Sequence, residues 1–376
     1  MGSEMCIRDR LCSDNPLTEN SMGHESTSKH SKDLKIIWTE DLRFVPREAS
    51  KTPFILAHEF FDALPVHVFQ SVAPPPSPPP PKQGDTIETP TGPIPAPASG
   101  TRRLPQEHQW RELMVSPTPP HRLKEGEPEF ELSMAKAATP HSMYLPELSA
   151  RYRALKRTEG ATIEVSPESL AYAREFAVRL GGSNPPSAAS QQHSAQVQGR
   201  KVPSAPREEP FIREQASGAA LIIDYGPAGN IPANSLRGIK AHARVSPFHS
   251  PGTTDVSADV DLLALAESAI TSSPGVEVHG PVDQARFLTA MGIEERAAQL
   301  VKKAVDAERA GGGGGKDKGE LTEIVKRIET GWRRLVDVSP NGMGGLYQVM
   351  AVVPYAPSSP GQPRRRPVGF GGDIAV

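Results

Sequence analysis

The segment His58–Asp62 (HEFFD) places an imidazole and two carboxylates within five positions. It begins like H-E-x-x-H, the pattern that sets two zinc-binding histidines one helical turn apart. The fifth position is Asp62, so the second imidazole is missing. A zinc site needs three or four protein ligands. We therefore predict no metal at this motif and no metal site elsewhere.

Other catalytic loops are incomplete. Gly311–Gly315 followed by Lys316 looks like a phosphate-binding loop, but Ala310 stands at the first glycine position and Asp317 replaces the magnesium-binding hydroxyl. We expect a flexible linker there. The sequence has no G-x-S-x-G, so a serine hydrolase would lack its nucleophile, and no G-x-G-x-x-G follows a strand, so no complete nucleotide site is present.

Composition limits the class of protein. The 376 residues include 40 prolines and 32 glycines, only 37% are hydrophobic, and 5% are aromatic. Proline is about twice as frequent as usual, which indicates a packed domain diluted by segments that cannot fold. The net charge of −2 argues against nucleic-acid binding. No apolar run is long enough to span a membrane. Cys6 and Cys12 both lie near the start, so no disulfide framework or thiolate metal site is expected in the body.

Hydrophobic patterning predicts the elements that must position the reactive residues. Short apolar runs bounded by turn residues predict strands at Leu34–Trp38, Phe54–Ala57, Val66–Gln70, Trp110–Val115, Phe130–Met134, Ala161–Val165, Ala219–Ile223 and Leu346–Val353. Helical periodicity and capping residues predict helices at Ser166–Gly181, Asp259–Ile270, Gln284–Met291, Glu294–Ala310 and Leu321–Val336. The third, fourth and fifth strands are expected to form a meander. Strands alternating with helices indicate an α/β fold with a mixed sheet.

Segments without periodicity set the expected domain boundaries. The foldable part is predicted to span residues 34–353. Outside this part we expect a non-native or disordered head at residues 1–33 and a disordered tail at 354–376. Within it we expect two disordered proline-rich insertions at 73–108 and 183–210 and a flexible linker at 311–316. The run PPPSPPPPK is typical of a surface insertion, and a ligand of an SH3 or WW domain is the alternative.

Four collinear stretches carry a resemblance. They read ILAHEFFDALPVHVF at 55–69, GAALIIDYG at 218–226, SLRGIKAHARVSPFHSPGTTDVSADVDLLALA at 235–266 and GPVDQARFLTAMGIE at 280–294. In this order they resemble the MidA-like S-adenosylmethionine-dependent methyltransferase family, over about Leu34 to Val353 without the insertions. The resemblance implies a Rossmann-like methyltransferase fold with an added helical part after Gly226.

The resemblance also implies an activity. Mitochondrial members of this family are protein arginine methyltransferases that assist the assembly of respiratory complex I. For this chain it implies S-adenosylmethionine as cofactor, ω-N-methylation of arginine with symmetric dimethylation, and a mitochondrial location. The implied partner is a core subunit of mitochondrial complex I, with no nucleic acid and no membrane span.

Two departures from the family pattern matter. His58 replaces the usual asparagine. The family's first strand and its E-x-G-x-G-x-G loop, which cradle the methionine and ribose, precede the FFDALP block, and nothing before Leu34 matches them. We therefore expect a C-terminal portion of a methyltransferase that binds little S-adenosylmethionine and is inactive alone. A non-catalytic assembly or scaffold protein is the alternative function.

The family chemistry points to particular side chains. Guanidinium is always protonated in water, so a site that methylates arginine must grip it with carboxylates. Glu59, Asp62 and Asp224 follow two predicted strands, at the edge where open α/β sheets place their sites, and we predict them as catalytic. His58, Phe60 and Tyr225 are predicted to contact the cofactor. The alternatives are that Glu59 and Asp62 cap a helix, and that Asp224 and Tyr225 end a solvated strand.

Overall fold

The computed structural model describes residues 18–20, 23–74, 86–90, 92–95, 107–124, 126–183, 210–241, 243–310, 318–357 and 366–371. The chain divides into two compact units, residues 1–52 and 53–376. The first unit is a three-stranded antiparallel sheet of β1 (Thr18–Asn20), β2 (Gly23–Thr27) and β3 (Lys35–Trp38), followed by the short 3-10 helix η1 (Leu42–Phe44).

The expectation of a disordered head is therefore wrong for residues 18–20 and 23–27. Their polar sequence lacks an apolar period, but the predicted strand β3 gives them a partner. The register places Glu25 opposite Ile37 and His24 opposite Trp38. Pairing with a distant strand, rather than local hydrophobicity, decides the conformation here.

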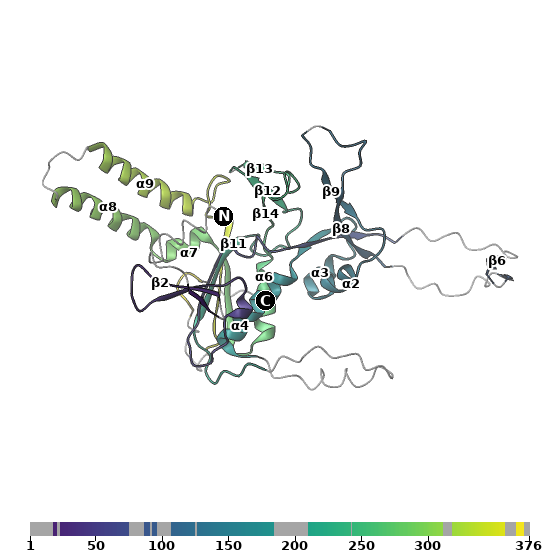
Figure 1. The fold of residues 1–376 in the computed structure, drawn as a ribbon, viewed down its shortest axis with the longest axis horizontal. Helices are drawn as coiled ribbons and strands as arrows, with labels where there is room; N and C mark the ends of the chain where they lie inside the picture. Colours follow the sequence, from purple (N-terminus) through teal and green to yellow (C-terminus); the bar gives the residue numbers. More distant parts are fainter. Residues whose placement is uncertain are drawn as a thin grey trace. The chain divides into compact units, whose positions relative to one another are not determined.

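The main sheet of the second unit has the order β15-β16-β11-β4, and Figure 1 labels its interior strand β11. Its strands are β4 (Phe54–His58), β11 (Ala219–Tyr225), β15 (Val276–Asp283) and β16 (Tyr347–Pro354). β4 runs parallel to β11, whereas β16 runs antiparallel to β11 and β15. The predicted strand Ala219–Ile223 is thus an interior strand, hydrogen-bonded on both sides, and the mixed α/β architecture is confirmed.

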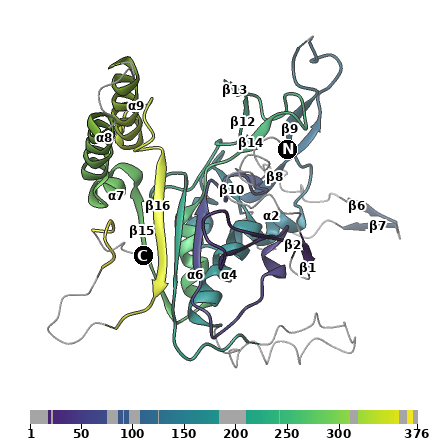
Figure 2. The ribbon, with the colours of Figure 1, turned by 60° about the vertical axis from the view of Figure 1, so that its left-hand side comes forward.

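Helices cover both faces of this sheet (Figure 2). On one face lie α4 (Pro167–Gly181) and α6 (Leu262–Ser272), and on the other α7 (Gln284–Ala290). Val349 and Ala351 of β16 pack with Phe287 of α7. The alternate residues Met350 and Val352 are also buried and face the opposite side of the sheet, because side chains alternate along a strand.

The helix boundaries follow local sequence signals. Ser166 is the N-cap of α4, as predicted, and its hydroxyl accepts a 3.2 Å hydrogen bond from the Ser169 N–H. Asp261 caps α6 in the same way. The predicted amphipathic helices α8 (Ile293–Ala310) and α9 (Lys318–Val336) pack against each other as a hairpin, seen on the left of Figure 1. The predicted linker 311–316 lies outside the described residues.

A second, antiparallel sheet has the order β10-β5-β8-β9. It comprises β5 (His67–Val72), β8 (Gln109–Pro117), β9 (Phe130–Met134) and β10 (Thr162–Val165). The predicted meander is confirmed, and the predicted strand Ala161–Val165 joins this sheet as β10. β10 pairs with β5, with Ile163 opposite Phe69. Both side chains are fully buried in the core that this sheet forms with α3 (Ala150–Leu155), where Tyr152 is also buried.

The remaining elements are small. α2 (Pro140–Tyr144) and η2 (Leu145–Glu147) precede α3, and β12 (Arg237–Lys240), β13 (Ala243–Val245) and β14 (Asp255–Ser257) form a three-stranded sheet. β6 (Thr86–Thr89) and β7 (Gly92–Pro95) form a hairpin. The first insertion is expected to lack regular structure, and that is wrong for these two strands. Residues 184–209 of the second insertion lie outside the described residues.

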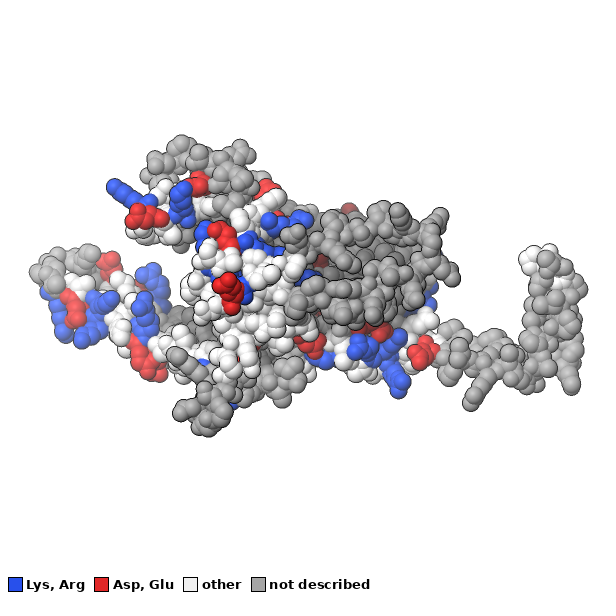
Figure 3. Space-filling model, turned by 90° about the horizontal axis from the view of Figure 1, so that it is seen from below, with Lys and Arg blue, Asp and Glu red and all other residues white. Residues whose placement is uncertain are grey.

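The predicted disordered tail is also partly ordered. Pro354 still belongs to β16, and Phe370 is only 3% exposed because its ring packs on Phe287. A single aromatic anchor within a Pro/Gly/Arg-rich stretch gives no periodic signal in the sequence. Among the described helices, none is long and apolar enough to cross a bilayer. Lysine and arginine are interspersed with aspartate and glutamate over the face in Figure 3, as the small net charge leads one to expect.

Candidate active site

The candidate site lies at one edge of the main sheet. Parallel pairing of β4 with β11 brings their carboxyl ends to the same edge, where the antiparallel strand β16 begins. His58 lies opposite Ile223, and Tyr225 lies opposite Tyr347. The predicted residues that follow β4 and those that end β11 are therefore brought together, as expected from their positions.

The turn after β4 is held by Asp224. Glu59 adopts a left-handed conformation at φ +48°, which is uncommon for a residue with a side chain. Its N–H donates to the Ile223 carbonyl at 3.0 Å. The N–H groups of Phe60 and Phe61 then donate to Asp224 Oδ2 at 3.1 and 2.8 Å. Asp224 is 0% exposed. By accepting these hydrogen bonds, its carboxylate fixes the turn that carries Glu59 and Asp62.

The helix-capping alternative for Glu59 and Asp62 is wrong. Residues 61–64 form a turn closed by a 3.2 Å hydrogen bond from the Leu64 N–H to the Phe61 carbonyl, and β5 begins at His67. Pro65 disfavours helical conformation at the preceding residue, which explains why no helix starts here. Asp62 is only 8% exposed, and its backbone carbonyl accepts from the Ala258 N–H at 3.0 Å.

Two tyrosines form a hydrogen-bonded group with the exposed carboxylate of Glu59. The Tyr347 hydroxyl donates to Glu59 Oε1 and is also hydrogen-bonded to the Tyr225 hydroxyl. The two tyrosine rings lie 4.1 Å apart, and the exposed His58 ring stacks on Tyr347 with 6.1 Å between centroids. Glu59 is therefore oriented by a hydroxyl instead of being left free in solvent.

Arg237 closes the opposite side of this group. Its guanidinium lies 5.2 Å from the centre of the Tyr225 ring, and its Nη1 is 2.6 Å from Asp259 Oδ1. The site therefore already contains one arginine stacked on an aromatic face and paired with a carboxylate.

The predicted Phe60 faces a different neighbour. Its ring meets Tyr172 of α4 edge-on at 4.9 Å and Phe61 at 5.1 Å. Phe61 in turn packs on Phe176 at 6.0 Å. This aromatic group ties the turn to α4, while His58 and Tyr225 flank the carboxylate of Glu59.

Burial dominates the electrostatics of the buried acids, and neighbouring carboxylates add to it. Burial, with a further contribution from the charge of Asp62, raises the pKa of Asp224 to about 6. Burial and the nearby charge of Glu59 likewise raise the pKa of Asp62, and Arg237 offsets this only in part. Burial raises the pKa of Tyr225 and Tyr347 as well, so both hydroxyls keep their protons at neutral pH. An added cation would relieve the repulsion among the three acids.

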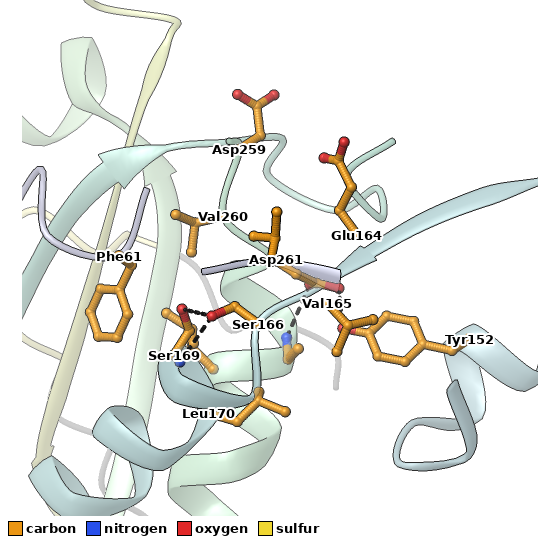
Figure 4. A pocket seen from close by; sticks show the side chains of 13 residues that line it. Phe61, Tyr152, Glu164, Val165, Ser166, Ser169, Leu170, Asp259, Val260 and Asp261 are labelled. Carbon is orange, nitrogen blue, oxygen red and sulfur yellow. Dashed lines mark hydrogen bonds between the residues drawn. The ribbon is translucent and has the colours of Figure 1, made fainter. Parts of the chain in front are cut away.

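A cavity of about 20 Å³ is lined by Phe61 and by residues of β10, α4 and α6 (Figure 4). Acidic side chains that line the cavity already have hydrogen-bond partners. Glu164 accepts a hydrogen bond from the Ser235 N–H at 2.9 Å, and Asp261 accepts one from the Tyr152 hydroxyl at 3.0 Å. Such a volume holds about one water molecule, so this cavity is no cofactor pocket.

Sequence reasoning missed Tyr347 and Arg237 as members of the site. Arg237 lies within the SLRG block, and Tyr347 follows the glycines before the last strand, so position in the blocks was the available signal. Their proximity to Glu59 and Tyr225 could not be derived from spacing, because Tyr347 and Glu59 are 288 positions apart.

Comparison with known proteins identifies the family. A family model described as "Putative S-adenosyl-L-methionine-dependent methyltransferase" matches residues 8–282, so the chain belongs to this family. The match begins ahead of Leu34, where the resemblance was expected to start.

Individual relatives agree with the family. The chain is 28% identical over 325 residues to the rat (Rattus norvegicus) protein named protein arginine methyltransferase NDUFAF7, mitochondrial, covering 86% of this chain and 50% of that protein. It is 25% identical over 325 residues to the human (Homo sapiens) protein of the same name, covering 86% and 49%. The chain thus spans about half the length of these relatives.

A solved structure is similar as well. It comes from Burkholderia thailandensis and contains S-adenosyl-homocysteine, and it aligns with a TM-score of 0.46 at 19% identity, covering 84% of this chain and 56% of that one.

Proposed function

We propose that the chain takes part in S-adenosylmethionine-dependent methylation of arginine in a protein substrate. Family membership and the names of the relatives support methyl transfer. The observation that carries the arginine assignment is the group of carboxylates at the edge of the main sheet, where burial and mutual repulsion raise the pKa of Asp62 and Asp224. Such a site favours a cationic acceptor.

In this proposal Glu59 and Asp62 hold the acceptor guanidinium. Glu59 is exposed and oriented by the Tyr347 hydroxyl, so its second oxygen is available to a ligand. Asp224 is a positioning residue, because its oxygens already accept backbone N–H groups from the turn. Holding both acceptor nitrogens in one orientation lowers the entropic part of the barrier to an in-line displacement.

The residues present fit one part of the cofactor. The carboxylates and the rings of His58 and Tyr225 suit its positively charged sulfonium. Bound S-adenosylmethionine would supply the methyl group. The N–H groups of Phe60 and Phe61, which otherwise could bind the methionine carboxylate, are taken by Asp224. We propose that these residues form the sulfonium side only, and that the 376-residue chain binds the cofactor weakly and is inactive alone.

The finer assignments extend from the relatives. We propose a mitochondrial role in the assembly of complex I, with a core subunit of that complex as substrate and symmetric ω-N-dimethylarginine as product. The relatives' names support the mitochondrial and arginine parts of this statement.

The test is methyl transfer from labelled S-adenosylmethionine to arginine peptides, with matched lysine peptides as control. The assay compares the 376-residue chain with a protein that carries this chain together with an E-x-G-x-G-x-G cofactor loop. We expect label on arginine only, with the longer protein only, and mass spectrometry of the product separates symmetric from asymmetric dimethylation. Label on lysine, or on neither peptide with both proteins, would contradict the proposal.

A scaffold role is the second candidate. Apolar side chains of β8 and β9 are exposed, among them Met114 at 50%, Val115 at 58% and Met134 at 43%. Exposed apolar strands mark contact surfaces. A protein that lacks transferase activity in both forms yet still binds complex I subunits would favour this alternative.

A further inference from the structure

A second group of reactive side chains lies on the antiparallel sheet, apart from the carboxylates discussed above. It consists of His67 at the start of β5, Glu112 in β8 and His141 in α2. The Nδ1 atom of His67 is 2.7 Å from Glu112 Oε1, and the Nδ1 atom of His141 is 3.7 Å from the same oxygen. One potential ligand atom from each of the three side chains lies within 4.8 Å of the other two. Two imidazoles and a carboxylate thus converge on one point.

The sheet register produces this convergence. Phe69 lies opposite Glu112, so His67, two residues away on the same face of β5, is the diagonal neighbour of Glu112. His141 comes from the first turn of α2, which packs against β8 (Figure 1). The imidazole rings of His67 and His141 lie 4.3 Å apart. Three separate elements therefore supply one side chain each.

An outer partner orients the carboxylate. The Thr139 hydroxyl donates to Glu112 Oε2, which leaves Oε1 directed at the two histidines. Thr139 is also the N-cap of α2 and accepts from the Ser142 N–H at 3.0 Å. One threonine thus fixes both the carboxylate and the helix that carries His141. Hydrogen-bonded outer partners of this kind orient the ligands of metal sites.

Glu112 is only 7% exposed. A buried carboxylate is costly unless a positive group compensates it. A divalent ion bound among the three side chains would supply that positive charge. His141 keeps 57% of its side chain exposed, so this position is open to solvent.

We propose that Nδ1 of His67, Nδ1 of His141 and Oε1 of Glu112 bind a divalent transition-metal ion, with Zn²⁺ as the fitting choice. Imidazole nitrogen favours zinc over magnesium or calcium. Three protein ligands with a fourth position open to solvent are typical of exchangeable or catalytic zinc rather than of a closed structural site. This set forms no motif in the sequence, because its members come from three elements.

The test is a calorimetric titration of the full chain with Zn²⁺, with Mg²⁺ as a comparison ion. We expect one Zn²⁺ per chain and no heat from Mg²⁺. His141→Gln should weaken binding at least about 100-fold, the upper end of what loss of an outer partner alone costs. His121→Gln is the matched control, because His121 is an exposed histidine of the β8–β9 loop and should leave the affinity unchanged.

The folded state and the cysteines are controlled separately. His141 is largely exposed, so the melting temperature of metal-free His141→Gln should equal that of the parent. A double Cys6→Ser, Cys12→Ser protein should keep its Zn²⁺ affinity. No binding at about 100 µM Zn²⁺, weaker than roughly −5.5 kcal/mol, would overturn the proposal and leave a hydrogen-bonded His–Glu–His cluster. Equal affinity in parent and His141→Gln, or loss of binding with the cysteines, would overturn it as well.

Discussion

Three carboxylates at the edge of the main sheet occupy different environments, and this separates their roles. Asp224 is fully buried and accepts backbone N–H groups, Asp62 is nearly buried, and Glu59 is exposed and hydrogen-bonded to Tyr347. Buried groups with a raised pKa occur frequently at functional sites, although structural networks raise pKa values too. Substitution of single residues distinguishes these possibilities.

The first prediction concerns Asp62. Asp62→Asn keeps the size of the side chain and removes its charge, so the turn should fold as before. If Asp62 grips the guanidinium during transfer, turnover should fall about 100-fold, or ~2.7 kcal/mol in barrier height. Asp255→Asn, at an exposed position in β14, is the control. Turnover and melting temperature are measured together on an active protein that contains this chain. Unchanged turnover with a lowered melting temperature would show that Asp62 stabilises the fold and has no catalytic role.

The second prediction concerns the pH dependence set by Asp224. Burial raises its pKa to about 6 in the folded protein, above the value of about 3.9 expected in the unfolded chain. Between these values the folded state binds more protons, so the free energy of unfolding should fall as pH rises from about 4 to 6, by at most about 3 kcal/mol. Urea unfolding at several pH values measures this slope. Asp224→Asn should flatten it, and an equal slope in both proteins would refute the assignment.

At the scale of elements, the pairing of β4 with β11 builds the site. Their parallel register brings Glu59 and Asp224 to one edge, and the Gly218 that precedes β11 allows the two strands to approach closely. Gly218 has φ +92°, and a Cβ placed there would lie 2.0 Å from the Pro53 carbonyl oxygen. Only glycine fits this position without displacing β4.

The third prediction follows from this contact. Gly218→Ala should lower the free energy of unfolding by about 2–4 kcal/mol, because it adds a backbone clash to an unfavourable φ. Gly229→Ala is the control, since a Cβ there meets nothing within 4 Å, and it should change stability by less than ~0.5 kcal/mol. Urea denaturation of the two variants gives the comparison. Equal stabilities would mean that β4 and β11 can separate at this end without cost.

At the scale of the whole molecule, the end of the chain returns to the core of the second unit. Phe370 packs with Phe287, Val349 and Ala351, so the last described segment covers the face of the main sheet that also carries α7. The ring of Phe370 lies 5.4 Å from that of Phe287. A segment with the composition of a disordered tail is therefore part of the folded unit.

The fourth prediction tests this anchoring. Phe370→Ala should destabilise the protein by about 3 kcal/mol, near the lower end for truncation of a buried phenylalanine. Val368→Ala, two residues away at a position that is 68% exposed, should have an effect below ~0.5 kcal/mol. Hydrogen exchange of β16 should rise in the first variant only. The same exchange in both variants would show that the segment does not hold the sheet.

The amino-acid sequence by itself determined the elements that have strong local signals. The apolar run Ala219–Ile223, the N-cap Ser166 and the periodic helix Leu321–Val336 each specify their conformation through neighbours a few residues away. It also determined that Glu59 and Asp224 lie at one edge, because the ends of adjacent parallel strands must meet.

The tertiary structure alone decided which distant groups touch. Tyr347 reaches Glu59, Phe370 fills a gap beside Phe287, and β10 joins β5 instead of the main sheet. His67, Glu112 and His141 converge only because two strands and a helix pack together. The physical reason is that local spacing fixes the direction of a side chain along its own element, whereas the partner it meets depends on how all apolar faces of the chain are buried together.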